Sequence, residues 1–140
     1  MLYLDTSLLV AALTNEPDTE RMQGWLGRHA EGDLAISDWV ATEFSSALSI
    51  KLRAGHIEPA HRADALAMFA RLCADNFLVV PVSRLQFRAA ARFADQHQLS
   101  LRAGDALHLA VCADHGAILC TLDRPLSDAG SALGIKTMLL

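Results

Sequence analysis

The sequence lacks several features that would place it in a common class of proteins. Its 140 residues contain no apolar run of about 18 residues, the length that a membrane-spanning helix needs. The first five residues, Met1-Leu2-Tyr3-Leu4-Asp5, include no basic leader and no small-residue cleavage site. We therefore expect no export signal and a cytoplasmic location.

Disulfide and zinc-binding patterns are also missing. The cysteines are odd in number, none has C-x-x-C spacing, and each lies in an apolar segment: Cys73, Cys112 and Cys120. We interpret them as reduced core residues. The six histidines form no H-x-x-x-H pair and, with the cysteines, no zinc spacing.

An excess of basic charge is absent as well. The chain has 12 basic and 16 acidic residues and a formal net charge of −4. This balance counts against broad, nonspecific binding of nucleic acid, which relies on clustered Lys and Arg. Any contact with RNA therefore has to come from a local patch.

What the sequence does contain is an alternation of short apolar strands and helices, which we interpret as one domain over residues 1–140. Its hydrophobic fraction of 52% is enough for a folded core. The expected strands are 1–4, 34–36, 77–82, 117–122 and 136–139, and the expected helices are 7–13, 18–30, 38–53, 59–75, 84–97, 102–115 and a short one before the last strand. Ser37 or Asp38, and Ser100, are candidate helix caps, and Gly55 and Gly116 are expected helix ends. Apolar strands separated by helices predict an α/β fold with a mainly parallel sheet.

Two acidic residues directly follow expected strands. Asp5 follows the first strand, and Asp123 follows the strand at 117–122. Because sites in parallel α/β sheets lie beyond the carboxyl ends of the strands, both residues are candidates for a site. Each also has a purely structural explanation, since Asp5 suits a helix cap and Asp123 suits a turn before Pro125.

Two further acidic residues lie on expected helices. Glu43 has Trp39, Val40 and Ala47 one turn away, so its carboxylate faces a mostly buried stripe. Burial there requires a cation or hydrogen-bond donors, unless the side chain reaches solvent or pairs with an arginine. Asp105 begins a helix, a place where the helix dipole alone favours an acid.

Convergence of the four acids would give them a chemical role. Their mutual repulsion would raise the pKa of at least one carboxyl group, and an oxygen-rich cluster suits Mg²⁺ or Mn²⁺ rather than zinc. His108 follows Asp105 by one turn, and we expect it to pack or form hydrogen bonds rather than bind metal. No G-x-S-x-G, Cys–His or phosphate-binding glycine motif offers another catalytic set.

Four short motifs, in this order and over essentially the whole chain, resemble the PIN-domain family. They are Leu4-Asp5-Thr6-Ser7, Thr42-Glu43-Phe44, Gly104-Asp105-Ala106-Leu107-His108-Leu109-Ala110 and Thr121-Leu122-Asp123. The chain length and the D-A-L-H-L-A segment are similar in particular to VapC-type toxins of bacterial toxin–antitoxin pairs. The resemblance implies a PIN-like α/β/α sandwich with a short, mainly parallel sheet, and a Mg²⁺- or Mn²⁺-dependent endoribonuclease. It also implies a cognate antitoxin protein and a homodimer.

The resemblance assigns the acids to a tetrad that hydrolyses RNA phosphodiester bonds. Asp5 and Asp105 would be the main metal ligands, and Asp123 would bind the metal directly or through water. Glu43 would act through a metal-bound water molecule. The metal would activate water for attack on phosphorus.

Supporting residues are implied as well. Ser7 and Thr121 match small polar positions that support the site, although capping or packing would also explain them. Arg102 and Arg124 are the candidate RNA contacts. Lys51 and Arg53 are better explained as solvated surface charge.

Other interpretations stay open on sequence alone. The chain could be a catalytically silent PIN-like binding module or a DNA-directed nuclease of related fold. An aspartyl-phosphate phosphatase would need a second Asp two residues after Asp5, where Ser7 stands. A receiver domain would need an acidic pair near the first strand and a late lysine, and Asp5 has no acidic neighbour.

Overall fold

A single parallel sheet organises the structure. The computed structural model describes residues 1–140, and its five strands pair only in parallel, in the order β3-β2-β1-β4-β5. The strands are β1 (Leu2–Leu4), β2 (Leu34–Ser37), β3 (Phe77–Val80), β4 (Ile118–Thr121) and β5 (Thr137–Leu139). The α/β fold expected from the sequence is confirmed.

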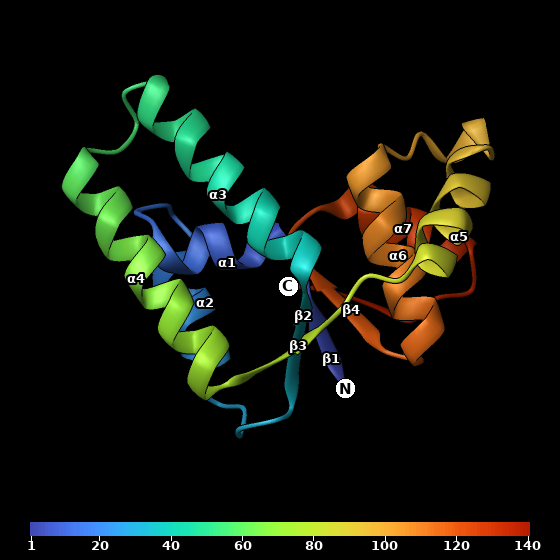
Figure 1. The fold of residues 1–140 in the computed structure, drawn as a ribbon, viewed down its shortest axis with the longest axis horizontal. Helices are drawn as coiled ribbons and strands as arrows, with labels where there is room; N and C mark the ends of the chain where they lie inside the picture. Colours follow the sequence, from blue (N-terminus) through green and yellow to red (C-terminus); the bar gives the residue numbers. More distant parts are fainter.

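Helices cover both faces of this sheet. The helices are α1 (Thr6–Leu13), α2 (Thr19–Leu26), α3 (Asp38–Arg53), α4 (Pro59–Asp75), α5 (Arg84–Ala94), the 3₁₀ turn η1 (His97–Leu99), α6 (Ala103–His115) and α7 (Arg124–Ala132). Figure 1 shows α1–α4, in blue to green, on one side of the strands and α5–α7, in yellow to red, on the other. None of the helices is both long and apolar enough to cross a membrane.

The central strands are short because they are enclosed by helices and run directly into them. Tyr3, Leu4, Leu119 and Cys120 are fully buried, as expected for a parallel sheet covered on both faces. The cysteines are free, and Cys112 and Cys120 are buried core residues as expected, whereas Cys73 is only partly buried against the core.

Several expected boundaries and caps differ from the structure. Strand β3 ends at Val80 because Pro81 has no N–H to continue the ladder. Helix α2 ends at Leu26 instead of residue 30, and α5 ends at Ala94 before η1. Ser100 does not cap α6, since its backbone is left-handed with φ 53° and Arg102 occupies the cap position.

Ser37 does occupy the cap position of α3, but its side chain makes no capping hydrogen bond. Its hydroxyl pairs with the Tyr3 hydroxyl instead, at 2.7 Å. The local pattern was right about where the helix begins and wrong about the partner of the Ser37 side chain. The helix end expected near Gly116 is confirmed, with φ 60° at that glycine.

The strand order creates a switch point between β1 and β4. After β1 the chain builds β2 and β3 on one side, then returns to place β4 and β5 on the other. In doubly wound sheets, the crevice at such a reversal is the usual binding place, just beyond the carboxyl ends of the strands. Asp5 follows β1 and Asp123 follows β4 within two residues, so both lie at this crevice.

Gly130 tests how tightly α7 packs on the rest of the fold. A Cβ at this helical position would lie 2.6 Å from Thr137 Cγ2 and 2.9 Å from Leu109 Cδ2. We predict that Gly130→Ala lowers the free energy of unfolding by about 1 kcal/mol or more, because overpacking exceeds the gain in helix propensity. Gly24→Ala in α2 is the matched control, since a Cβ there meets no atom within 4 Å. It should stabilise the protein by about 0.5–1 kcal/mol. Urea denaturation measures both, and a stabilising Gly130→Ala would contradict the packing.

Candidate metal-dependent active site

Asp5 is fixed at the end of the central strand by hydroxyl groups from two elements. Its Oδ2 accepts hydrogen bonds from Ser7 Oγ at 2.5 Å and from Thr121 Oγ1 at 2.7 Å, and the Ser7 N–H contributes at 3.4 Å. The register of β1 and β4 pairs Leu4 with Cys120, which places Thr121 beside Asp5. Only 5% of Asp5 is exposed, so these donors replace the water that its carboxylate has lost.

Glu43 reaches the same crevice from α3. Its Oε2 accepts hydrogen bonds from Thr6 Oγ1 at 2.6 Å and pairs with His108 Nε2 at 2.7 Å. Burial alone would raise the pKa of this carboxyl group, but His108 and Thr6 outweigh it, so the pKa lies below its ordinary value. The indole N–H of Trp39 also lowers this pKa, although it has no partner within hydrogen-bond geometry.

His108 connects the two acids to the core. Its Nε2 lies 3.4 Å from Asp5 Oδ1 as well as beside Glu43, and its Nδ1 lies 3.0 Å from the Tyr3 hydroxyl. The side chain is 1% exposed. Burial lowers its pKa, but the hydrogen bond to Glu43 and the nearby acidic charges prevail and raise it above its ordinary value. The expectation that His108 forms hydrogen bonds is confirmed.

Asp105 lies in the first turn of α6, and Asp123 caps α7. The pKa of Asp105 is raised, first by burial and then by the charges of Asp123 and Asp5, against a lowering by His108. Asp123 Oδ1 accepts from the Leu126 N–H at 3.0 Å, and the Asp123 N–H donates to Thr121 Oγ1 at 2.9 Å. Asp105 is therefore close enough to Asp123 and Asp5 to feel their charges, and the expected raised pKa belongs to Asp105.

One oxygen of each of three carboxylates accepts hydrogen bonds from protein donors. Asp5 Oδ2, Glu43 Oε2 and Asp123 Oδ1 accept the hydrogen bonds from protein donors. Ligand atoms of Asp5, Glu43 and His108 lie within 4.8 Å of one another. Carboxylate oxygens are the ligands preferred by Mg²⁺ and Mn²⁺. The carboxylate oxygens of Asp5 and Glu43 therefore fit such an ion, with the His108 ring beside them, whereas Asp105 and Asp123 lie outside this group and their role as ligands stays a prediction.

The comparison with protein families agrees with this arrangement. The family model of the PIN domain matches residues 2–131, which include all four acids. The chain belongs to the PIN-domain family. No curated protein sequence matches it.

Solved structures share the PIN fold at low sequence identity. VapC20 of Mycobacterium tuberculosis, described as a sarcin–ricin loop cleaving toxin, has a TM-score of 0.74 at 21% identity, covering 93% of this chain and 95% of that chain. FitAcB from Neisseria gonorrhoeae has a TM-score of 0.70 at 17% identity, covering 99% and 96%. VapBC2 from Rickettsia felis, solved with a fragment of promoter DNA, has a TM-score of 0.69 at 17% identity, covering 99% and 98%.

Basic residues of this PIN domain differ in their surroundings. Arg102 at the cap of α6 and Arg124 at the start of α7 are exposed, and each lies within three residues of a candidate acid. Lys51 forms an ion pair with Glu16 at 2.6 Å, as a surface residue would. The two arginines flank candidate acids in the sequence and are exposed.

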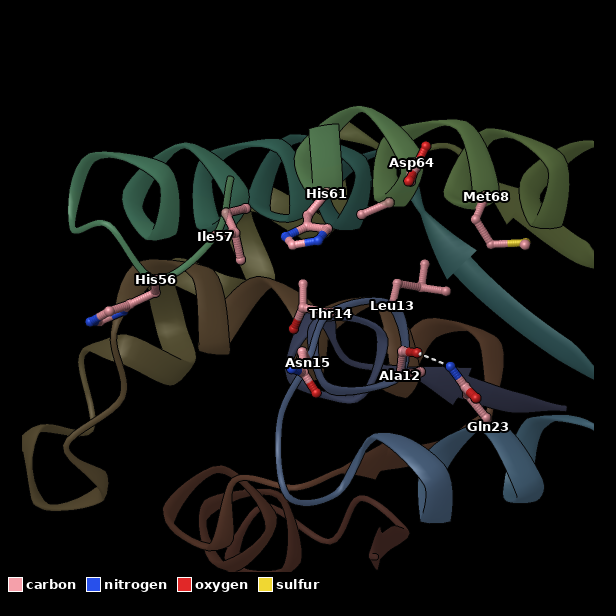
Figure 2. Close-up of a pocket in the computed structure, with 11 residues that line it drawn as sticks. Ala12, Leu13, Thr14, Asn15, Gln23, His56, Ile57, His61, Asp64 and Met68 are labelled. Atoms are coloured by element: carbon pink, nitrogen blue, oxygen red, sulfur yellow. Dashed lines mark hydrogen bonds between the residues drawn. The ribbon is translucent and has the colours of Figure 1, made fainter. Parts of the chain in front are cut away.

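A separate hollow of about 510 Å³ lies on the α1–α4 side of the molecule (Figure 2). It is bordered by the end of α1, by α2, by the α3–α4 loop and by α4, and its polar residues include His56, His61 and Asp64. None of the four acids lines this hollow. It is therefore distinct from the candidate site.

The raised pKa of Asp105 makes a prediction about the metal-free protein. A raised folded pKa means that the folded state loses stability as pH rises from the ordinary value of 3.8 through the raised value. Asp105→Asn removes the charge, so it should raise the melting temperature in EDTA at neutral pH. The gain should stay below about 1 kcal/mol, because the half-exposed carboxylate is screened by solvent.

Asp38→Asn is the matched control, because Asp38 is also an acid in the first turn of a helix but lies exposed on α3. It should destabilise slightly, by about 0.3–1 kcal/mol, through loss of the favourable helix dipole interaction. Thermal melts in EDTA and in excess Mn²⁺ compare the variants, and Asp105→Asn should gain less from Mn²⁺ than the wild type. If Asp105→Asn instead behaves like Asp38→Asn in both conditions, Asp105 is only a helix-stabilising acid.

Proposed function

We propose that this PIN domain is a Mg²⁺- or Mn²⁺-dependent endoribonuclease that acts as the toxin of a toxin–antitoxin pair. The observation that carries the proposal is that ligand atoms of Asp5, Glu43 and His108 lie within 4.8 Å of one another at the switch point, with one oxygen of Asp5 and of Glu43 held by protein donors. A surface cluster of acids without a ligand would not need such a set of buried donors.

Asp5, Asp105 and Asp123 would hold the ion, and Glu43 would lie beside it. When bound, the ion supplies a lower pKa for attacking water and positive charge next to the phosphodiester. The lowered pKa of Glu43 keeps this carboxylate ionised at neutral pH, so it accepts a hydrogen bond from the attacking water and orients it. Arg102 and Arg124 would contact phosphate oxygens of the substrate.

Other residue types do not supply an alternative nucleophile in the crevice. Burial raises the pKa of the Cys120 thiol to about 11, so this cysteine stays neutral and unreactive. Tyr3 is fully buried, and burial also raises its pKa above the ordinary value. Hydrolysis by water is therefore the chemistry that this set of residues supports.

RNA is the substrate that we test first. VapC20, which shares the fold, is described as a toxin that cleaves the sarcin–ricin loop, so an RNA hairpin of that sequence is a suitable probe. Because the chain carries a net charge of −4, affinity for RNA should depend on local arginines and weaken as salt is added, with a slope set by the small number of phosphate contacts.

The wild-type protein should cleave this hairpin in Mg²⁺ or Mn²⁺ and be inactive in EDTA. Asp5→Asn and Asp105→Asn should lower the rate by about 100-fold or more while the far-UV spectrum is retained, because each removes charge from the ion's ligands. Asp128→Asn, an exposed acid on α7, is the control and should cleave at the wild-type rate. Gel assays on RNA and on the DNA hairpin of the same sequence measure the rates. Undiminished cleavage in EDTA would refute the metal dependence, and cleavage of DNA alone would identify a DNA nuclease.

We also propose that the domain forms a homodimer and binds a small antitoxin protein near the acids. Solved structures with this fold include toxin–antitoxin complexes. Leu85 and Phe87 on α5 are 71% and 54% exposed, and the mean hydropathy is +0.24, so apolar surface is available for association. The acidic crevice would attract an arginine of the antitoxin by charge pairing.

Co-expression with the adjacent reading frame should yield a stable complex that no longer cleaves RNA. Light scattering at micromolar concentration should give the mass of a dimer for the toxin alone. A monomer, together with the absence of a co-purifying partner, would contradict this part of the proposal.

A further inference from the structure

We propose that His108 is a positioning residue that holds Glu43 through Oε2, and that Gly104 is a positioning residue because it leaves open the space that Oε1 occupies. The inference rests on the proposed function, because it assigns Glu43 a defined orientation in a metal-dependent site. Neither residue would bind the ion. Each would act through Glu43.

The first oxygen, Oε2, is held by two donors from different parts of the chain. Thr6 Oγ1 donates at 2.6 Å from the start of α1, and His108 Nε2 lies at 2.7 Å from the middle of α6. Two short hydrogen bonds to a single oxygen restrict rotation of the carboxylate group. The second oxygen, Oε1, is therefore directed by the same contacts.

The second oxygen occupies space that only glycine leaves open. A Cβ on residue 104 would lie 2.5 Å from Glu43 Oε1 and 3.3 Å from Trp39 Nε1. Gly104 lies in the first turn of α6 without a positive φ, so its backbone does not require glycine. Glycine in a helix costs about 1 kcal/mol relative to alanine, and the close approach of Glu43 is the contact that explains it.

The two ring nitrogens of His108 have different partners, and Nε2 is the one that contacts Glu43. Its Nδ1 lies 3.0 Å from the Tyr3 hydroxyl, which lies 2.7 Å from Ser37 Oγ. The ionised Glu43 carboxylate can only accept, so its contact at 2.7 Å requires a proton on His108 Nε2, whether the ring is neutral or protonated. A nitrogen that carries a proton has no lone pair for a metal ion. In this arrangement His108 acts on Glu43 as a donor, and the variants below test this role against that of a ligand.

Two variants of His108 separate the role of a positioning residue from that of a metal ligand. His108→Gln retains an amide N–H that can reach Glu43, whereas His108→Leu retains bulk without a donor. We expect His108→Leu to weaken Mn²⁺ binding and lower kcat by about 10-fold or more with little change in KM, and His108→Gln to restore both to within about 3-fold of the wild type. If His108 is a ligand, His108→Gln will bind Mn²⁺ as poorly as His108→Leu, and the proposal is wrong.

Gly104→Ala covers the possibility that a substitution at the buried His108 prevents folding. The Glu43 carboxylate is the end of a flexible side chain, so it should swing away without unfolding the protein. We expect a melting temperature within a few degrees of the wild type and a loss of about 10-fold in Mn²⁺ affinity and kcat. Gly24→Ala, where a Cβ meets nothing within 4 Å, is the control and should leave the Mn²⁺ affinity and kcat unchanged.

A double-mutant cycle shows whether Gly104 acts through Glu43. In a Glu43→Ala background, Gly104→Ala should not weaken Mn²⁺ binding further, because the side chain it displaces is gone. An equal loss in both backgrounds would refute the proposal. The melting temperatures of the same four proteins give a readout without metal: Gly104→Ala should be more favourable in the Glu43→Ala background than in the wild type. If the wild type neither binds Mn²⁺ nor cleaves RNA, the proposed function fails, and equal melting shifts in both backgrounds would then refute the positioning of Glu43.

Discussion

The burial of the Asp5 carboxylate is the constraint on which the rest of the site depends. A charged group that is 5% exposed must find donors inside the protein, and the donors here are Ser7 on α1 and Thr121 on β4. These contacts tie the central strand, the helix that follows it and the neighbouring strand to one oxygen atom. Thr121 also accepts the Asp123 N–H, so the position of Asp5 is coupled to the start of α7.

A second consequence is that the acids have different electrostatic surroundings. Glu43 lies beside His108 and Thr6, and its pKa is lowered, whereas burial and then the charges of Asp123 and Asp5 raise the pKa of Asp105. The fold thus stabilises the charge on one carboxylate and leaves repulsion around another. A divalent cation would relieve that repulsion, so binding free energy and folding free energy are linked at this site.

The order of the elements and the position of the acids follow from local patterns in the sequence. Short apolar strands separated by helices predict the α/β fold, and Asp5 and Asp123 follow β1 and β4 within two residues. The boundaries of α4 at Pro59 and Asp75 are also local, because proline favours the first turn of a helix. The roles of the acids in metal binding and cleavage remain predictions, since geometry alone does not measure chemistry.

What the sequence by itself determined is therefore the fold class and the acids at its strand and helix ends, because periodicity, turns and caps are properties of neighbouring residues. Only the tertiary structure decided how those acids are held. The pairs Tyr3–Ser37, Glu43–His108 and Tyr3–His108 are separated by 34, 65 and 105 residues, and no local pattern connects them. The need for glycine at residue 104 likewise arises from a side chain on another helix. Such contacts exist only after the helices have packed, because burial is what makes an unpaired polar group costly and close approach possible.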